Sequence, residues 1–303
     1  MSKKAFLFPG QGAQVVGMGK ALAESNSNVA ELFQKANEVL GYDLAKVCFD
    51  GPTEEINLTN RSQPGLFVAS LAALETAKQD NPDLVDSIDF AAGLSLGEYT
   101  AMVFAGAIDF EDGLKLVQER GDAMQAAADE VASSMVSVLG LEREQVEAVC
   151  DEARQDGEIL QVANLLCPGN IVVSGHQSAC DRVDEAARNA GAMRAIELAV
   201  AGAFHTPLME SALERLKTAL ANTKIRPPRI PVVSNVDAKP HDSPDEIREI
   251  LVRQVCSPVL WNPSMQYLME QGVGEFYEVG PGKVLKGLLK RIDRKMPCES
   301  ISA

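Results

Sequence analysis

The spacing of hydrophobic residues changes along the chain in a way that predicts alternating strands and helices. Short apolar runs at residues 4–8 and 88–94 each lead into glycine and are typical of buried strands. Strands that alternate with helices favour a mainly parallel sheet covered on both faces. Apolar residues recur at helical spacing in the segments 20–40, 63–78, 97–106 and 112–128.

A different pattern begins near residue 132 and lasts to about residue 199. Strands and helices follow there in the order βαββαβ, which is the order of ferredoxin-like units. We therefore predict a ferredoxin-like subdomain at residues 129–199, inserted into a larger α/β domain formed by residues 1–128 and 200–303. Its expected strands are 135–139, 159–164, 170–174 and 193–198, and its helices 142–153 and 177–190. The larger domain has further expected strands at 231–235 and 276–279, the second being its last core strand.

Composition and charge exclude several classes of protein. The chain has 303 residues, 46% of them hydrophobic and 23% charged, which is typical of a globular protein. A net charge of -15 argues against binding to nucleic acid or to an anionic membrane. The first apolar run stops at Phe8, too early for a secretion signal, so we expect a cytoplasmic protein. The six scattered cysteines and three histidines lack metal-ligand spacing, so we expect neither disulfides nor a metal site. No other cofactor is expected.

The sharpest local motif is Gly93-Leu94-Ser95-Leu96-Gly97, which stands between an expected strand and an expected helix. In this context G-x-S-x-G is typical of a nucleophile elbow, where a tight turn exposes a serine hydroxyl at the positive end of a helix. The two glycines are needed because a Cβ at either position would clash with neighbouring backbone. The alternative is a simple strand–helix junction in which Ser95 only caps the helix.

A serine nucleophile needs a base, and the chain has three histidines. His241 lies in a polar loop rich in proline and is expected to be solvated, and His176 resembles a turn residue of the insertion. His205 lies where the chain returns from the insertion to the larger domain. Although a lone histidine is more often structural, exclusion among the three favours His205 as the base.

Arg120 stands on the apolar stripe of the helix 112–128, three residues after Val117 and four before Met124. An inward arginine needs an anion because its guanidinium keeps its charge. That anion is either an internal Asp or Glu, which the helix pattern alone slightly favours, or a substrate carboxylate held by two hydrogen bonds.

Two glycine-rich loops narrow the classes of ligand. The GQG loop at residues 10–12 would present backbone N–H groups at the carboxyl end of the sheet, but it lacks the G-x-G-x-x-G fingerprint of dinucleotide sites. The GPGK loop at residues 280–283 lacks the other residues of a P-loop, which argues against a nucleoside triphosphate.

Seven blocks of the sequence together resemble the malonyl-CoA:acyl-carrier-protein transacylases, which load malonyl groups in bacterial-type fatty-acid synthesis. The match is collinear from Phe8 to Ile292, and acyltransferase domains of polyketide synthases share it. The resemblance implies an α/β-hydrolase-like body with a ferredoxin-like insertion. The blocks are FPGQGAQ, GLSLGE, QERG with its arginine, GAFHTPLM, SNVDA, RQVCSPVLW with its glutamine, and EVGPGKVLKGLLKRI.

The resemblance also implies roles for the matching residues. Ser95 would be acylated and His205 would be its base. The backbone N–H groups of Gln11 and Leu96 would form the oxyanion hole. Arg120 would hold the free carboxylate of malonate, which settles the choice that the helix pattern leaves open.

Three further residues belong to the expected site. Gln254 would line it beside His205, and a main-chain carbonyl would orient the imidazole in place of a triad carboxylate. Leu94 departs from the family, which often has histidine there, and the elbow should tolerate it because its geometry depends on the glycines and the serine. Phe204 leaves less room for an extra methyl group and favours malonyl over methylmalonyl, by about 1–3 kcal/mol at most.

Malonyl-CoA and acyl carrier protein are the partners that the resemblance implies, and we expect a monomer. Because both proteins are acidic, docking needs a local basic patch. The alternatives are a transacylase of a polyketide pathway, a serine thioesterase or esterase, and an acyl-binding module without catalysis. The candidate patch at the C-terminal helix consists of Lys283, Lys286, Lys290 and Arg291, with an ordinary solvated helix end as the other interpretation.

Overall fold

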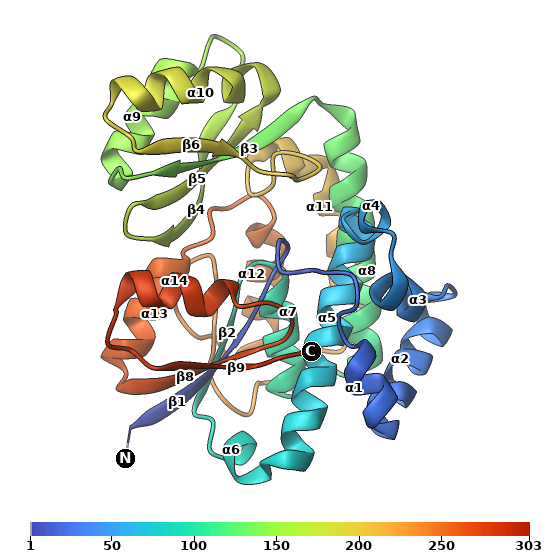
Figure 1. The fold of residues 1–303 in the computed structure, drawn as a ribbon. Helices are drawn as coiled ribbons and strands as arrows, with labels where there is room; N and C mark the ends of the chain where they lie inside the picture. The colour runs from blue at the N-terminus through green and yellow to red at the C-terminus, as the bar shows by residue number, and fades with distance from the viewer. Residues whose placement is uncertain (1) are drawn as a thin grey trace.

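The computed structural model describes residues 2–303 and contains two separate β-sheets (Figure 1). The five-stranded sheet lies in a larger body, and the four-stranded sheet lies in a smaller unit above that body in this view. The chain enters the smaller unit after α8 (Phe110–Glu130) and leaves it after β6 (Arg194–Glu197). The predicted α/β class is confirmed.

The five-stranded sheet of the body is parallel throughout, as predicted. Side chains of its central strand alternate between two cores, because successive residues of a strand face opposite sides. Phe6 and Phe8 belong to the core beneath α5, α7 and α8, whereas Ala5 and Leu7 belong to the core beneath α13 and α14. The strand order is β7 (Val232–Val233), β2 (Phe90–Gly93), β1 (Lys3–Phe8), β8 (Val273–Val279) and β9 (Cys298–Ile301).

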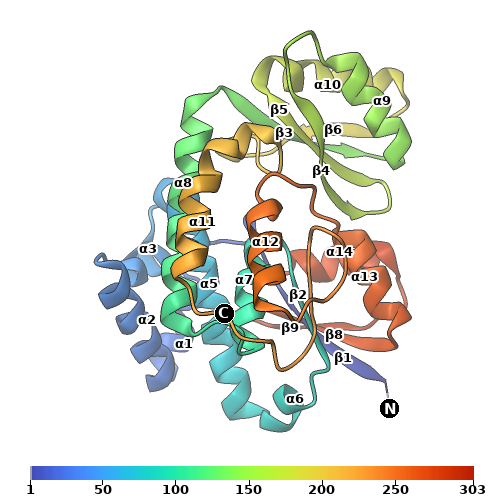
Figure 2. The same ribbon diagram turned by 180° about the vertical axis from the view of Figure 1, so that it is seen from behind.

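Helices cover both faces of this sheet, and α8 and α11 run side by side on the far side of the molecule (Figure 2). No helix within residues 2–303 is both long and apolar enough to cross a membrane. Besides α8, the body contains α1 (Lys20–Ser25), α2 (Ser27–Leu40), α3 (Leu44–Asp50), α4 (Thr53–Ile56), α5 (Thr59–Asp80), α6 (Pro82–Asp86), α7 (Leu96–Phe104), the 3-10 helix η1 (Pro207–Ala212), α11 (Leu213–Asn222), α12 (Pro244–Gln254), α13 (Trp261–Glu270) and α14 (Val284–Ile292).

The smaller unit has the predicted ferredoxin-like arrangement. Its four strands form an antiparallel sheet in the order β4-β5-β3-β6, with both helices packed on it around a separate apolar core. The boundaries at residues 129 and 199 stay a prediction. The elements are β3 (Ser133–Leu139), α9 (Arg143–Ala153), β4 (Leu160–Cys167), β5 (Asn170–His176), α10 (Gln177–Asn189) and β6.

Three details differ from the sequence-based expectations. The helix expected at 20–40 is two helices, because Asn26 is extended and its side chain caps α2 by accepting from the backbone of Asn28. The strand expected at 231–235 is shorter than expected: only Val232 and Val233 form β7, which pairs with β2. After the core strand at 276–279 a further strand follows that was not expected, since β9 pairs with β8; the short, half-buried sequence of β9 gives little strand signal.

The two crossings between the body and the smaller unit touch each other. The backbone N–H of Ala203 donates to Ser133 Oγ at 3.1 Å. A Cβ added to Gly202 would lie 2.6 Å from the Cβ of Ala128, so the outgoing and returning segments are in close contact. The end of α8 and the segment that leads to His205 are therefore held together.

Candidate active site

Ser95 lies in a strained turn between β2 and α7. Its φ of 49° and ψ of -99° are unusual for a residue with a side chain. A Cβ on Gly93 would lie 1.9 Å from the carbonyl carbon of Gly97, and one on Gly97 would lie 2.0 Å from the carbonyl oxygen of Phe8. Both positions therefore require glycine, and the strand–helix elbow that the motif indicates is present.

Asn235, which follows β7, fastens this turn from the neighbouring strand. Its Oδ1 accepts from the backbone N–H of Ser95 at 2.6 Å, and its Nδ2 donates to the carbonyl of Gly93 at 2.8 Å. Asn235 is 1% exposed, so both bonds lie in the protein interior. Two buried hydrogen bonds of this kind hold a backbone conformation that would otherwise relax. The sequence gives no role to Asn235.

His205 faces the hydroxyl of Ser95, with 3.0 Å between Nε2 and Oγ. On its other side, Nδ1 lies 2.8 Å from the main-chain carbonyl oxygen of Gln254. A carbonyl accepts only, so Nδ1 carries the proton and Nε2 is left as an acceptor. Burial, together with the charge of Arg120, lowers the pKa of His205 to about 4, and the imidazole is neutral at physiological pH.

Arg120 reaches the same hydroxyl from α8. Its Nη2 lies 3.0 Å from Ser95 Oγ and 3.0 Å from Gln254 Oε1, and its Nη1 donates to Gln63 Oε1 at 2.6 Å. The side chain is 1% exposed, and no carboxylate within residues 2–303 forms an ion pair with it. The internal pair that the helix pattern slightly favours is therefore absent among the described residues.

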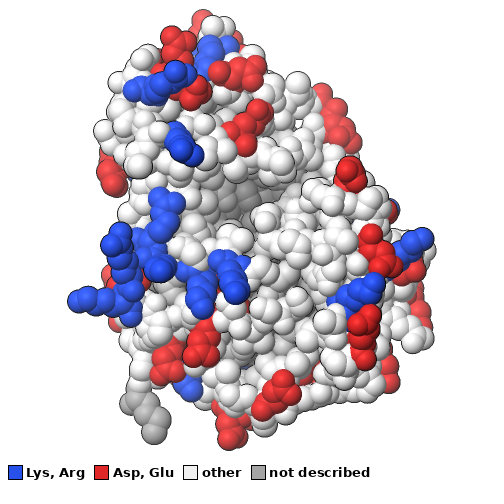
Figure 3. All heavy atoms as spheres, in the orientation of Figure 1, with Lys and Arg blue, Asp and Glu red and all other residues white. Residues whose placement is uncertain are grey.

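The site opens into a cavity of about 280 Å³ between the body and the smaller unit. In the space-filling view a hollow lies between these two parts of the molecule (Figure 3). Phe204 and Gln11 line the cavity beside Ser95 and His205, whereas Gln254 and Arg120 lie directly behind them. The remaining wall is mostly apolar and includes Leu94, Met124, Met135, Leu166, Val172, Leu198, Val200, Val284 and Leu288.

Two residues beside Ser95 have backbone N–H groups without a partner among the described residues: Gln11, which lines the same cavity, and Leu96, which follows in the chain. Within residues 2–303, the N–H groups of Gln11 and Leu96 donate to no other group. Leu96 is the first residue of α7, so its N–H also lies at the positive end of the helix. Unpartnered backbone donors are what an oxyanion hole requires.

The other two histidines lie elsewhere. His176 is the last residue of β5, and its Nδ1 accepts from the backbone of Ile159. His241, expected to be solvated, is half-buried and lies 2.9 Å from Asp237 Oδ2. Within residues 2–303 no group of three or more His, Cys, Asp or Glu side chains is arranged to hold a metal ion.

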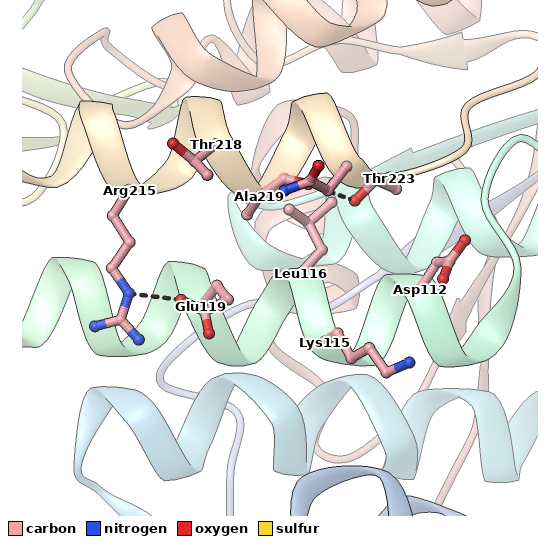
Figure 4. Close-up of a pocket in the computed structure, with 9 residues that line it drawn as sticks. Asp112, Lys115, Leu116, Glu119, Arg215, Thr218, Ala219 and Thr223 are labelled. Atoms are coloured by element: carbon pink, nitrogen blue, oxygen red, sulfur yellow. Dashed lines mark hydrogen bonds and ion pairs between the residues drawn. The ribbon is translucent and has the colours of Figure 1, made fainter.

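A larger cavity of about 560 Å³ lies between α8 and α11 (Figure 4). Polar and charged side chains line much of it, and its arginine, Arg215, pairs with Glu119. It contains no serine, cysteine or histidine that could act as a nucleophile or base. The smaller cavity at Ser95 is therefore the candidate reaction site, because it contains a nucleophile and a base and the larger cavity does not.

A serine elbow beside a neutral histidine, on a parallel α/β body with a ferredoxin-like insertion, places the chain in the class of acyl transferases. Residues 5–300 match the acyl transferase domain family. The chain is 42% identical over its whole length to the malonyl CoA-acyl carrier protein transacylase of Bacillus subtilis, 94% of which is covered.

Solved structures agree with this relationship. An acyl carrier protein S-malonyltransferase from Vibrio cholerae superposes with a TM-score of 0.93 at 41% identity, covering 99% of this chain and 96% of the other. A malonyl-transacylase in complex with a type II PKS acyl-carrier protein superposes with a TM-score of 0.93 at 40% identity, covering 100% of this chain and 96% of the other. The chain belongs to the malonyl CoA-acyl carrier protein transacylase family.

Proposed function

We propose that this chain transfers the malonyl group of malonyl-CoA to the phosphopantetheine thiol of acyl carrier protein, through an ester on Ser95. The observation that carries the proposal is the position of Arg120, a buried arginine without a carboxylate partner in the described chain, 3.0 Å from Ser95 Oγ. An acyl group esterified to that oxygen and ending in a carboxylate would place an anion beside the guanidinium. Transfer to a carrier protein is supported by family membership.

In the first half-reaction, Ser95 Oγ attacks the thioester carbonyl while its proton passes to Nε2 of His205. The tetrahedral oxyanion is held by the N–H groups of Gln11 and Leu96, then collapses and releases CoA as its thiol when His205 returns the proton. In the second half-reaction, the carrier thiol gives its proton to His205, attacks the ester carbonyl and regenerates Ser95. This sequence predicts ping-pong kinetics.

The geometry supports transfer rather than hydrolysis. Within residues 2–303, His205 is oriented by the carbonyl of Gln254 and by no carboxylate, and most of the cavity wall is apolar and does not hold an attacking water. A thioesterase or esterase gains nothing from an arginine at the ester oxygen. Phe204 and Leu94 on the wall also limit the size of the acyl group.

The carrier protein is proposed to dock on a basic patch at α14, which consists of Lys283, Lys286, Lys290 and Arg291. Lys and Arg gather there beside the hollow in Figure 3, although the whole chain is acidic. Val284 and Leu288 of the same helix line the cavity, so a docked carrier would have its thiol arm near the entrance. Within residues 2–303 no carboxylate forms an ion pair with any patch residue: Lys283, Lys286, Lys290 and Arg291.

The same proposal includes a monomeric, cytoplasmic protein with two domains divided near residues 129 and 199. A carrier protein of a polyketide pathway is the alternative acceptor, since one of the similar structures is a complex with such a protein. Rates with the two kinds of carrier protein distinguish these acceptors, and size-exclusion chromatography tests the monomer.

Intact-protein mass spectrometry after mixing with malonyl-CoA tests the proposal. The wild type should gain one malonyl group, and Ser95→Ala should gain none. Ser137→Ala is the matched control, because Ser137 lines the same cavity but its hydroxyl is bonded to Asn170, and this variant should be labelled like the wild type. Label at wild-type level on Ser95→Ala, or no label on the wild type, would refute the assignment.

A further inference from the structure

Glu98 is a buried carboxyl group that the proposed reaction does not use. It lies on α7, three residues after Ser95, and is 0% exposed. Its Oε2 accepts from the side chain of Gln254 at 2.6 Å and from the backbone N–H of Asn235 at 3.1 Å. Glu98 is not among the residues that line the cavity, so it acts on the reaction only through other residues.

The side-chain amide of Gln254 connects Glu98 to the reacting groups. Its Nε2 donates to Glu98 Oε2 and, at 3.0 Å, to the main-chain carbonyl of Ser95. Its Oε1 accepts from Arg120 Nη2. All three bonds require one orientation of the amide, because a flipped amide would turn its N–H groups toward the guanidinium.

The carboxylate of Glu98 makes this orientation the stable one. Two donors converge on Oε2, the Ser234 hydroxyl also faces the carboxyl group, and all three favour its ionised form. Glu98 and Arg120 thus hold opposite ends of one amide, and their charges offset each other in the protein interior.

The ionisation of Glu98 lies within a range that experiments can reach. Burial raises the pKa of Glu98 to about 7, although hydrogen bonds from Gln254, Asn235 and Ser234 and the charge of Arg120 act to lower it. His205 is neutral in this range, and burial raises the pKa of Tyr99 to about 12. The groups that face Glu98 are Arg120 from α8, Tyr99 from α7, Gln254 from α12, and Ser234 and Asn235 after β7.

We propose that Glu98 is a positioning residue for malonyl transfer, which in its ionised form fixes the Gln254 amide and so aims Arg120 at the carboxylate of the acyl group. The inference rests on the proposed function, because it assigns that carboxylate to Arg120. It predicts that Glu98 affects malonyl groups far more than acetyl groups, which have no carboxylate for Arg120 to hold.

Substitutions at Glu98 test this role. Glu98→Gln keeps an acceptor oxygen for both donors but removes the charge, and Glu98→Ala removes both. We expect Glu98→Ala to lower kcat/KM for malonyl transfer by about 10- to 100-fold, as for loss of a charged hydrogen bond, and to change self-acylation by acetyl-CoA by less than about threefold. Thr100→Val is the control, since Thr100 lies on the same helix, is 1% exposed and has an unpartnered hydroxyl.

The pH profile provides a readout that a purely structural role would not change. Wild-type kcat/KM for malonyl transfer should fall as the pH drops through about 7, and Glu98→Gln should be flat there, at the low-pH level of the wild type. Equal losses for malonyl and acetyl, or an unchanged acid limb in Glu98→Gln, would overturn the inference. Failure of wild-type Ser95 to accept malonyl would instead refute the proposed function.

Discussion

The guanidinium of Arg120 and the hydroxyl of Ser95 lie 3.0 Å apart, although one comes from the middle of a long helix and the other from a strand–helix turn. Within residues 2–303 the hydrogen bonds of Arg120 go to neutral side chains, Gln63 and Gln254 besides Ser95, and it lies over the ring of Tyr99. The charge of Glu98 reaches Arg120 only through the Gln254 amide, so an incoming carboxylate would be the first anion in direct contact with the guanidinium.

Arg120→Ala should affect the transfer of malonyl and acetyl groups differently. Loss of a charged, two-pronged contact costs about 2–5 kcal/mol, so kcat/KM for malonyl transfer should fall by at least roughly 30-fold. Acetyl transfer should be kept or increased, and it serves as the control for correct folding. The measurement is transfer from each labelled CoA ester to carrier protein. Unaffected malonyl transfer would show that the carboxylate is held elsewhere.

His205 should make the protein more stable as the pH rises from 4 to 6.5. Its pKa in the folded protein, about 4, lies below the ordinary value of 6.5, so the unfolded chain binds more protons between these values. The free energy of unfolding of the wild type minus that of His205→Asn should therefore increase across this window and level off above it. Urea unfolding at a series of pH values measures it, and a pH-independent difference would contradict a buried neutral imidazole.

Asn235→Ala should weaken the elbow. It leaves the N–H of Ser95 and the carbonyl of Gly93 without partners, at a cost of about 2–3 kcal/mol in the free energy of unfolding. Asn262→Ala is the control, because no hydrogen bond from the side chain of Asn262 is seen within residues 2–303. The free energy of unfolding, measured by denaturation, and the rate of Ser95 acylation should both be lower than in the wild type for Asn235→Ala but not for Asn262→Ala. Equal behaviour of the two variants would show that the glycines alone hold the strained turn.

Charge reversal on α14 should affect one substrate only. Lys286→Glu with Lys290→Glu should raise the KM for carrier protein by roughly 5- to 30-fold, as expected for about 1–2 kcal/mol, and leave the KM for malonyl-CoA unchanged. Lys217→Glu with Lys224→Glu changes the net charge equally on another part of the surface and is the control. Equal effects on both substrates would exclude this patch as the docking surface.

Those parts of the site could be predicted from the sequence whose pattern lies within one short segment of the chain. The spacing of the glycines around Ser95 directly reflects two close backbone contacts, and the helical stripe correctly places Arg120 inward. The βαββαβ order predicted the insertion because each of its elements is regular and amphipathic.

Asn235 and Glu98 could not be predicted in this way. Asn235 contacts Ser95 across 140 positions of the chain, and nothing in the SNVDA block indicates that partner. Glu98 belongs to the same motif as Ser95, and an acidic residue in the first turn of a helix is usually solvated, favoured by the dipole. The one available signal was that its helix is otherwise apolar.

The contact between Gly202 and Ala128 has a consequence for how such a chain can vary. Because the outgoing and incoming segments meet at one point, residues inserted or deleted within the four-stranded unit would not separate the guanidinium from the imidazole. The part of the cavity wall that β3, β4 and β5 contribute can therefore change independently of the reacting residues. The four-stranded unit can vary in this way while Ser95, His205 and Arg120 keep their places.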